Sequence, residues 1–253
     1  MAKRSIAYLD SVFDISYTFI DHHSPLNALF LHGWGSSKEI MQQAFQGCFL
    51  NYNHLYVDLP GFNQSPNDEK VLETKDYANI INLFLKSVGK KAHVVFGHSF
   101  GGKVAILCEN ERMVLLSSAG ILEPKPLKVR CKILLAKIFK KLGLNLGFLR
   151  SKDAMGLNQA MYETFKKVVS EDFSEHFKRC EKEVLLFWGK DDKATPLSSA
   201  QKMQTLLKKS ALFVLEGDHF FFLNQAKEIE KGLFPFAFRG VYPIVCFQNT
   251  ICF

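Results

Sequence analysis

Short apolar runs that alternate with longer amphipathic stretches constrain the fold of this chain more than any other feature of its sequence. Short runs rich in β-branched and apolar residues favour strands, whereas apolar residues spaced three or four positions apart favour helices. Strands that alternate with helices along a chain are typical of a mostly parallel sheet covered by helices on both faces. The sequence therefore predicts an α/β fold.

Eight strands are predicted, and the first two differ from the rest. The runs span about residues 5–10, 15–20, 27–31, 54–58, 93–97, 113–118, 183–188 and 211–215. The first two leave no room for a crossover helix, so we expect them to form an antiparallel hairpin at one edge of the sheet. The other strands can be parallel. Helices are expected at 36–48, 75–88, 100–109 and 197–209, and another after His219.

The chain has 253 residues, and two of its segments depart from a plain alternation of strands and helices. Roughly sixty helix-like residues lie between the sixth and seventh predicted strands, which is too long for a simple connection. We therefore predict a core of residues 1–120 and 181–231 with a helical cap at 121–180. Residues 232–253 contain no acid, one Arg and five Phe. This atypical tail either packs on the core or does not belong to the native frame of the fold.

The motif Gly97-His98-Ser99-Phe100-Gly101-Gly102 lies between the apolar run 92–96 and the helix-like run 103–107. A Gly-x-Ser-x-Gly pattern between a strand and a helix is typical of a nucleophile elbow. The glycines are needed because the sharp turn crowds the backbone around the serine. The helix behind the turn adds a dipole that favours developing negative charge. Ser99 is therefore the predicted nucleophile, although an ordinary serine in a turn is the alternative.

A serine hydroxyl needs a general base, and that base needs a carboxylate that fixes its tautomer. In folds with a nucleophile elbow, the acid and then the histidine follow the serine along the chain. Asp191 and Asp192 follow the seventh predicted strand, and His219 follows the eighth. We predict that His219 is the base and that this loop supplies the acid. The alternatives are a surface histidine and a pair of aspartates that cap a helix.

Two further loops carry a family resemblance. His32-Gly33-Trp34-Gly35 follows the third predicted strand, and Asp58-Leu59-Pro60-Gly61-Phe62-Asn63-Gln64-Ser65 follows the fourth. With the elbow motif, they make the chain resemble the α/β-hydrolase superfamily over about residues 25–230, particularly its capped bacterial members related to carbon-carbon bond hydrolases and esterases. Asn63 stands where the family has glycine, and asparagine tolerates the left-handed conformation.

The resemblance refines the predicted site. The family spacing Gly-x-x-Asp-x-x-x-Pro selects Asp192 over Asp191. Some members carry the acid after the sixth strand, where this chain has Ser117-Ser118-Ala119-Gly120 and no acid. The resemblance also implies an oxyanion hole formed by the backbone N–H groups of Trp34 and Phe100.

Other residues of these motifs are given structural roles. His32 and Asp58 are expected to hold their loops. His98 either contacts a substrate or packs behind the elbow.

The implied architecture is the α/β-hydrolase fold, an eight-stranded and mostly parallel sheet flanked by helices, with a helical cap between the sixth and seventh strands. The implied activity is hydrolysis of a small ester, thioester or β-ketone with a hydrophobic acyl part, through a covalent intermediate at Ser99. Acyl transfer by the same triad is one alternative. A catalytically silent binding protein on this fold is another.

The net charge of +7 arises from one segment. Residues 121–180 hold 13 Lys and Arg against 6 Asp and Glu, while the remainder holds 19 of each. Residues 124–152 read as a basic amphipathic helix, which we interpret as a cap with an apolar underside. An anionic substrate and contact with a membrane surface are the alternatives. No nucleic-acid partner is expected.

The six cysteines contain no Cys-x-x-Cys pair, which argues against a metal knuckle or a thioredoxin-like site. The implied serine mechanism needs no metal or organic cofactor, and none is expected. Free buried thiols are typical of the reducing cytoplasm. Asp10 and Asp14 interrupt any apolar region of a secretory signal, and no run reaches the roughly eighteen apolar residues of a membrane-spanning helix. We therefore expect a cytoplasmic monomer or dimer.

Overall fold

A computed structural model describes residues 2–122, 156–233 and 245–246. Its nine strands form one sheet in the order β1-β2-β4-β3-β5-β6-β7-β8-β9. They are β1 Ala2–Tyr8, β2 Ser11–Ile20, β3 Asn27–Leu31, β4 Asn53–Val57, β5 Val94–His98, β6 Arg112–Leu116, β7 Glu183–Gly189, β8 Ser210–Leu215 and the two-residue β9 Val245–Cys246. The eight predicted strands are confirmed, and β9 pairs with β8.

The antiparallel part of the sheet is confined to one edge. β1 and β2 form the predicted hairpin, and β2 also pairs antiparallel with β4. Every other pair of neighbouring strands is parallel. Strands β3, β4 and β5 are buried along their whole length, as expected for parallel strands covered on both faces.

The helices follow the predicted positions but are mostly shorter. They are α1 Lys38–Phe45, α2 Thr74–Ser87, α3 Phe100–Leu107, α5 Gln159–Val168, α6 Ser174–Arg179, α7 Leu197–Leu206 and α8 Ala226–Leu233, with a short 3₁₀ turn, η3, at Phe221–Leu223. Helix α1 begins two residues later than predicted because Ser37 is extended, with φ of −148°. Helix α8 includes Gly232 and Leu233, the first two residues of the predicted tail.

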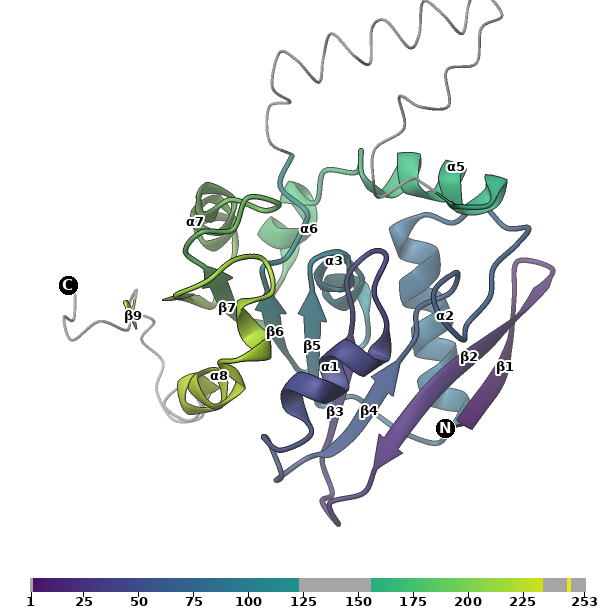
Figure 1. The fold of residues 1–253 in the computed structure, drawn as a ribbon, viewed down its shortest axis with the longest axis horizontal. Helices are drawn as coiled ribbons and strands as arrows, with labels where there is room; N and C mark the ends of the chain where they lie inside the picture. The colour runs from purple at the N-terminus through teal and green to yellow at the C-terminus, as the bar shows by residue number, and fades with distance from the viewer. Residues whose placement is uncertain (1, 123–155, 234–244, 247–253) are drawn as a thin grey trace, which may run out of the picture.

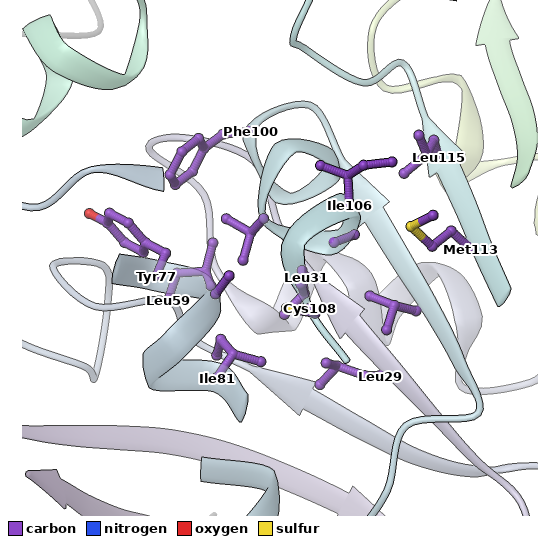
Figure 2. Packing of buried hydrophobic residues seen from close by; sticks show 14 of the residues in the cluster. Leu29, Leu31, Leu59, Tyr77, Ile81, Phe100, Ile106, Cys108, Met113 and Leu115 are labelled. Carbon is purple, nitrogen blue, oxygen red and sulfur yellow. The ribbon is translucent and has the colours of Figure 1, made fainter. Parts of the chain in front are cut away.

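Buried apolar residues form two clusters, and helices cover both faces of the sheet (Figure 1). One cluster contains the apolar faces of α2, α3 and α7, and the other contains those of α1 and α8. Figure 2 shows the first cluster, where side chains of α2 and α3 meet those of the central strands. Its members include Leu29, Leu31, Tyr77, Ile81, Phe100, Ile106, Met113 and Leu115. These contacts fix α3, and with it the turn that precedes α3, against the sheet.

Between β6 and β7, the described residues form α5 and α6. Helix α5 lies beyond the carboxyl ends of the central strands (Figure 1). It contacts the loop after β4 closely, because a Cβ atom at Gly61 would lie 2.2 Å from the Met161 sulfur. The predicted basic helix at 124–152 lies outside the described residues. The division into a core and a cap at residue 121 stays a prediction.

A buried ion pair fastens the segment after α5 to the core. Lys103 of α3 is 3% exposed, and its Nζ lies 2.9 Å from Glu171 Oε2. Lys103 also donates to the carbonyl oxygen of Val168 at the end of α5. The other Glu171 oxygen accepts from the backbone N–H of Thr74, the first residue of α2. Glu171 therefore joins two core helices to this segment.

We predict that Glu171→Gln destabilises the protein by about 3 kcal/mol, because it leaves the Lys103 ammonium buried without a charged partner. Adding Lys103→Met to Glu171→Gln is expected to restore most of that loss. Urea unfolding of the single and double variants measures both effects. The exposed pair Glu163–Lys166 gives the control, since Glu163→Gln should change stability by less than about 1 kcal/mol. Equal losses from Glu171→Gln and Glu163→Gln would contradict the prediction.

Candidate active site

The turn between β5 and α3 holds Ser99 in an unusual conformation. Ser99 has φ of 50° and ψ of −113°, a region that residues with a side chain seldom adopt. Three backbone hydrogen bonds hold it there: its N–H donates to Leu116, and its carbonyl accepts from Gly102 and Ala119, all within 3.1 Å. Such strain persists only where the surrounding structure compensates for it, and it is common at active sites. Ser99 itself is only partly buried.

Glycines allow the neighbouring backbones to approach this turn. A Cβ atom at Gly101 would lie 2.4 Å from the Leu31 carbonyl oxygen at the end of β3. A Cβ atom at Gly33 would lie 2.9 Å from His98 Nδ1 and 3.2 Å from Ser99 Cβ. The loop after β3 therefore lies directly against the elbow, as the predicted oxyanion loop requires.

Asp192 follows β7 and is buried with every acceptor position occupied. Its Oδ1 accepts from the N–H groups of Ala194 at 2.8 Å and Thr195 at 2.9 Å. Its Oδ2 accepts from the Thr195 hydroxyl and from His219 Nδ1, each at 2.8 Å. Burial raises the pKa of Asp192, but the hydrogen bonds from His219 and Thr195 outweigh it and lower that pKa to about 2. Asp191, the alternative, is exposed, and the side-chain hydrogen bonds of His219 among the described residues do not involve it.

His219 follows β8, next to the loop that carries Asp192. The two loops touch closely, since a Cβ atom at Gly189 would lie 2.1 Å from the Asp218 carbonyl oxygen. An ionised carboxylate can only accept hydrogen bonds, so Nδ1 of His219 carries the hydrogen and donates it in the bond to Asp192 Oδ2. With the hydrogen on Nδ1, the neutral form of this ring has an unprotonated Nε2, which is the form that a general base requires.

His98 links the elbow to the His219 loop. It is 1% exposed, and its Nε2–H donates to the backbone carbonyl of His219 at 3.0 Å. The two imidazole rings lie 4.7 Å apart. Burial lowers the pKa of His98 to about 3, so this ring is neutral. Of the two roles expected for His98, the contacts match packing behind the elbow.

The structure thus joins Asp192 and His219 directly, and it joins Ser99 to that pair through its neighbour His98. Within residues 2–122, 156–233 and 245–246, no hydrogen bond connects the Ser99 hydroxyl with His219. In ligand-free enzymes such bonds are often long and tighten only when a substrate is bound.

The predicted structural role of His32 is confirmed. Its Nδ1 donates to the Gly33 carbonyl at 2.7 Å, and its Nε2 accepts from the Leu59 N–H at 3.0 Å. His32 is fully buried, and burial lowers its pKa. The neutral ring therefore ties the loop after β3 to the loop after β4.

Asp58 also holds its turn, as predicted. It accepts from the backbone N–H of Lys38 at 2.8 Å and from its Nζ at 2.6 Å. Asn63 has φ of 48°, the expected left-handed conformation, and donates to Asp58 at 3.1 Å. Nothing in the sequence distinguished Lys38 from a surface lysine, yet its side chain is 1% exposed.

The two predicted oxyanion donors lie on neighbouring segments, Trp34 in the loop after β3 and Phe100 at the start of α3. Phe100 is the first residue of α3, so its N–H has no acceptor within the helix. The Trp34 ring packs against the rings of Phe100, Phe62 and Phe165, with centroids 4.9 to 5.5 Å apart. Residues of the core and of α5 therefore form one aromatic wall beside the elbow. The oxyanion role of Trp34 and Phe100 stays a prediction.

In the described part of the chain, no three or more His, Cys, Asp or Glu side chains gather as ligands for a metal ion. No helix there is long and apolar enough to span a membrane.

The low pKa of Asp192 predicts a pH-dependent contribution to stability. A depressed carboxyl pKa stabilises the folded state above the unfolded value of 3.8, and that stabilisation is lost as pH falls through the folded value of about 2. We expect Asp192→Asn to lower the free energy of unfolding by about 2 kcal/mol at pH 7 and by about half of that at pH 3. Urea unfolding at both pH values measures this, with the exposed Asp191→Asn as the control. An Asp192→Asn loss that is the same at both pH values would exclude the ionised carboxylate as its source.

The sequence of this chain matches a known protein family. The sequence model of the Alpha/beta hydrolase family matches residues 28–231. The chain is 23% identical over 218 residues to the uncharacterized hydrolase YugF of Bacillus subtilis, covering 73% of this chain and 80% of that protein. A Mycoplasma pneumoniae protein provisionally named esterase/lipase 2 is 30% identical over 98 residues. That match covers 38% of this chain and 36% of the relative.

Solved structures share the fold at low sequence identity. An esterase from Exiguobacterium antarcticum superposes with a TM-score of 0.71 and 18% identity, covering 92% of this chain and 98% of the esterase. A meta-cleavage product hydrolase from Pseudomonas fluorescens superposes with a TM-score of 0.66 and 18% identity, covering 92% and 97%. With a family model that matches most of its length, the chain belongs to the α/β-hydrolase family.

Proposed function

We propose that this protein is a serine hydrolase in which Ser99 is the nucleophile, His219 the general base and Asp192 the acid that orients His219. The observation that carries the proposal is the 2.8 Å hydrogen bond between His219 Nδ1 and Asp192 Oδ2. His98, next to the strained Ser99, donates to the His219 backbone carbonyl and so holds the His219 loop beside the Ser99 turn. The names of the relatives, which include an esterase and two hydrolases, agree with this class of activity.

The first half of the proposed reaction forms an acyl-enzyme. Ser99 Oγ attacks the substrate carbonyl carbon while its proton moves to His219 Nε2. Asp192, ionised at neutral pH, stabilises the resulting imidazolium. The N–H groups of Phe100 and Trp34 stabilise the negative charge on the carbonyl oxygen. The tetrahedral intermediate then collapses, and the leaving group departs with the proton from His219.

The second half releases the acyl group. His219 takes a proton from water, whose oxygen attacks the acyl carbon. The bond to Ser99 Oγ breaks, and the serine recovers its proton from His219. The products are the free acid and the unchanged enzyme, so no external oxidant or cofactor enters the balance.

The proposed substrate is a small ester, thioester or β-ketone with an apolar acyl part. The aromatic wall of Trp34, Phe62, Phe100 and Phe165 beside the elbow supports an apolar ligand, because recognition sites for such groups are lined mainly by hydrophobic and aromatic side chains. The cytoplasmic location and the monomeric or dimeric state stay predictions.

Labelling with a fluorophosphonate tests the proposed triad. We expect the wild type to be labelled at Ser99, and Ser99→Ala to abolish labelling. His219→Ala is expected to slow it at least about a hundredfold, because general-base catalysis contributes that much. Peptide mass spectrometry locates the label, and its time course gives the rate.

Asp191→Asn is the matched control for Asp192→Asn, since the two residues are neighbours and only Asp192 contacts His219. The first variant should keep the wild-type rate, whereas the second should lose at least tenfold. Hydrolysis of chromogenic esters of increasing acyl length then tests the substrate class. A folded wild type that reacts with neither a bulky nor a small fluorophosphonate would rule out an active serine hydrolase.

A further inference from the structure

Thr195 lies in the loop between β7 and α7. Each of its polar groups contacts the Asp192–His219 pair or a residue next to that pair. Its N–H donates to Asp192 Oδ1, and its carbonyl accepts from Trp188 Nε1 at 2.7 Å. Its hydroxyl oxygen lies 2.8 Å from Asp192 Oδ2, 3.1 Å from the Ser117 carbonyl oxygen and 3.3 Å from His219 Nδ1. The loops that follow β6, β7 and β8 at the carboxyl end of the sheet therefore meet at this side chain.

The hydroxyl has one proton and three polar neighbours. His219 Nδ1 cannot accept that proton, because it carries its own hydrogen toward Asp192. The two remaining acceptors are Asp192 Oδ2 and the Ser117 carbonyl oxygen. A hydrogen bond to an ionised acceptor is shorter and stronger than one to a neutral carbonyl, and the contact with Asp192 is the shorter by 0.3 Å. The proton therefore belongs between Thr195 and Asp192.

We propose that Thr195 is a positioning residue for the catalytic acid: its hydroxyl donates to Asp192 Oδ2 and holds that oxygen in line with His219 Nδ1. The inference rests on the proposed function, since it assigns Asp192 to the triad. Thr195 supplies two of the four hydrogen bonds that Asp192 accepts. Without the hydroxyl, a carboxylate that is 5% exposed would lose one donor and one restraint on its rotation.

The first test compares a substitution that removes the Thr195 hydroxyl with one that keeps it. Thr195→Val removes the hydroxyl and keeps the branched shape, so labelling of Ser99 by the fluorophosphonate is expected to fall about tenfold. Thr195→Ser keeps the hydroxyl and should stay within about twofold of the wild type. Thr205→Val is the matched control, because the Thr205 hydroxyl bonds to the Lys202 carbonyl on α7, away from the acid–base pair. It should leave the labelling rate unchanged.

The second test asks whether the hydroxyl acts through Asp192. In an Asp192→Asn background, Thr195→Val should slow labelling by less than about twofold, since the charged acceptor is already absent. The shift in the urea midpoint caused by Thr195→Val should likewise be at least halved in that background. A residue that only packs the loop, or donates only to Ser117, would cause the same shift in both backgrounds.

Equal midpoint shifts in the two backgrounds, or a Thr195→Ser variant as slow as Thr195→Val, would overturn the inference. If Thr195→Val does not fold, Thr195→Ala also lacks the hydroxyl and is compared in the same two backgrounds. The urea measurements need no labelling. Absence of labelling in the wild type would therefore reject the proposed function. The urea midpoint shifts in the two backgrounds would still decide whether Thr195 donates to Asp192.

Discussion

The close approach of backbones at the carboxyl ends of the central strands is the constraint on which the rest of the site depends. Ser99 keeps its strained conformation only because the ends of β3 and β6 lie within hydrogen-bonding or contact distance of the turn. A Cβ atom at Gly101 would collide with the backbone at the end of β3, and one at Gly33 would collide with the His98 side chain. The parallel sheet brings several loops together at the carboxyl ends of its strands, and the glycines allow these loops to come into contact there.

Asp192 is the electrostatic centre of the loops after β7 and β8. A buried carboxylate is costly unless its lone pairs are occupied, and four donors occupy those of Asp192. The same bonds that lower its pKa also orient His219. His98, neutral and buried, adds a bond to the backbone of the His219 loop. Asp192 is thus the buried charge of this site, and the neutral His98 ring lies 4.7 Å from the His219 ring.

Much of this arrangement could be predicted from the sequence because it rests on local patterns. Apolar runs located eight strands, and the short link between the first two predicted their antiparallel pairing. Asn63 was expected to replace a left-handed glycine, and it does. Helix ends were less accurate: α1 begins at Lys38 because Ser37 is extended, and α8 continues to Leu233. Helix boundaries depend on tertiary contacts that residue spacing does not encode.

The sequence by itself determined the fold class, the candidate nucleophile and the two loops that could supply an acid and a base, because each depends on residue type and chain order. Only the tertiary structure decided which aspartate contacts His219, that Lys38 and Lys103 are buried in ion pairs, and that Thr195 lies at the junction of three loops. These facts depend on where distant segments meet. Asp191 and Asp192 are adjacent in the chain, and only packing makes one buried and the other exposed.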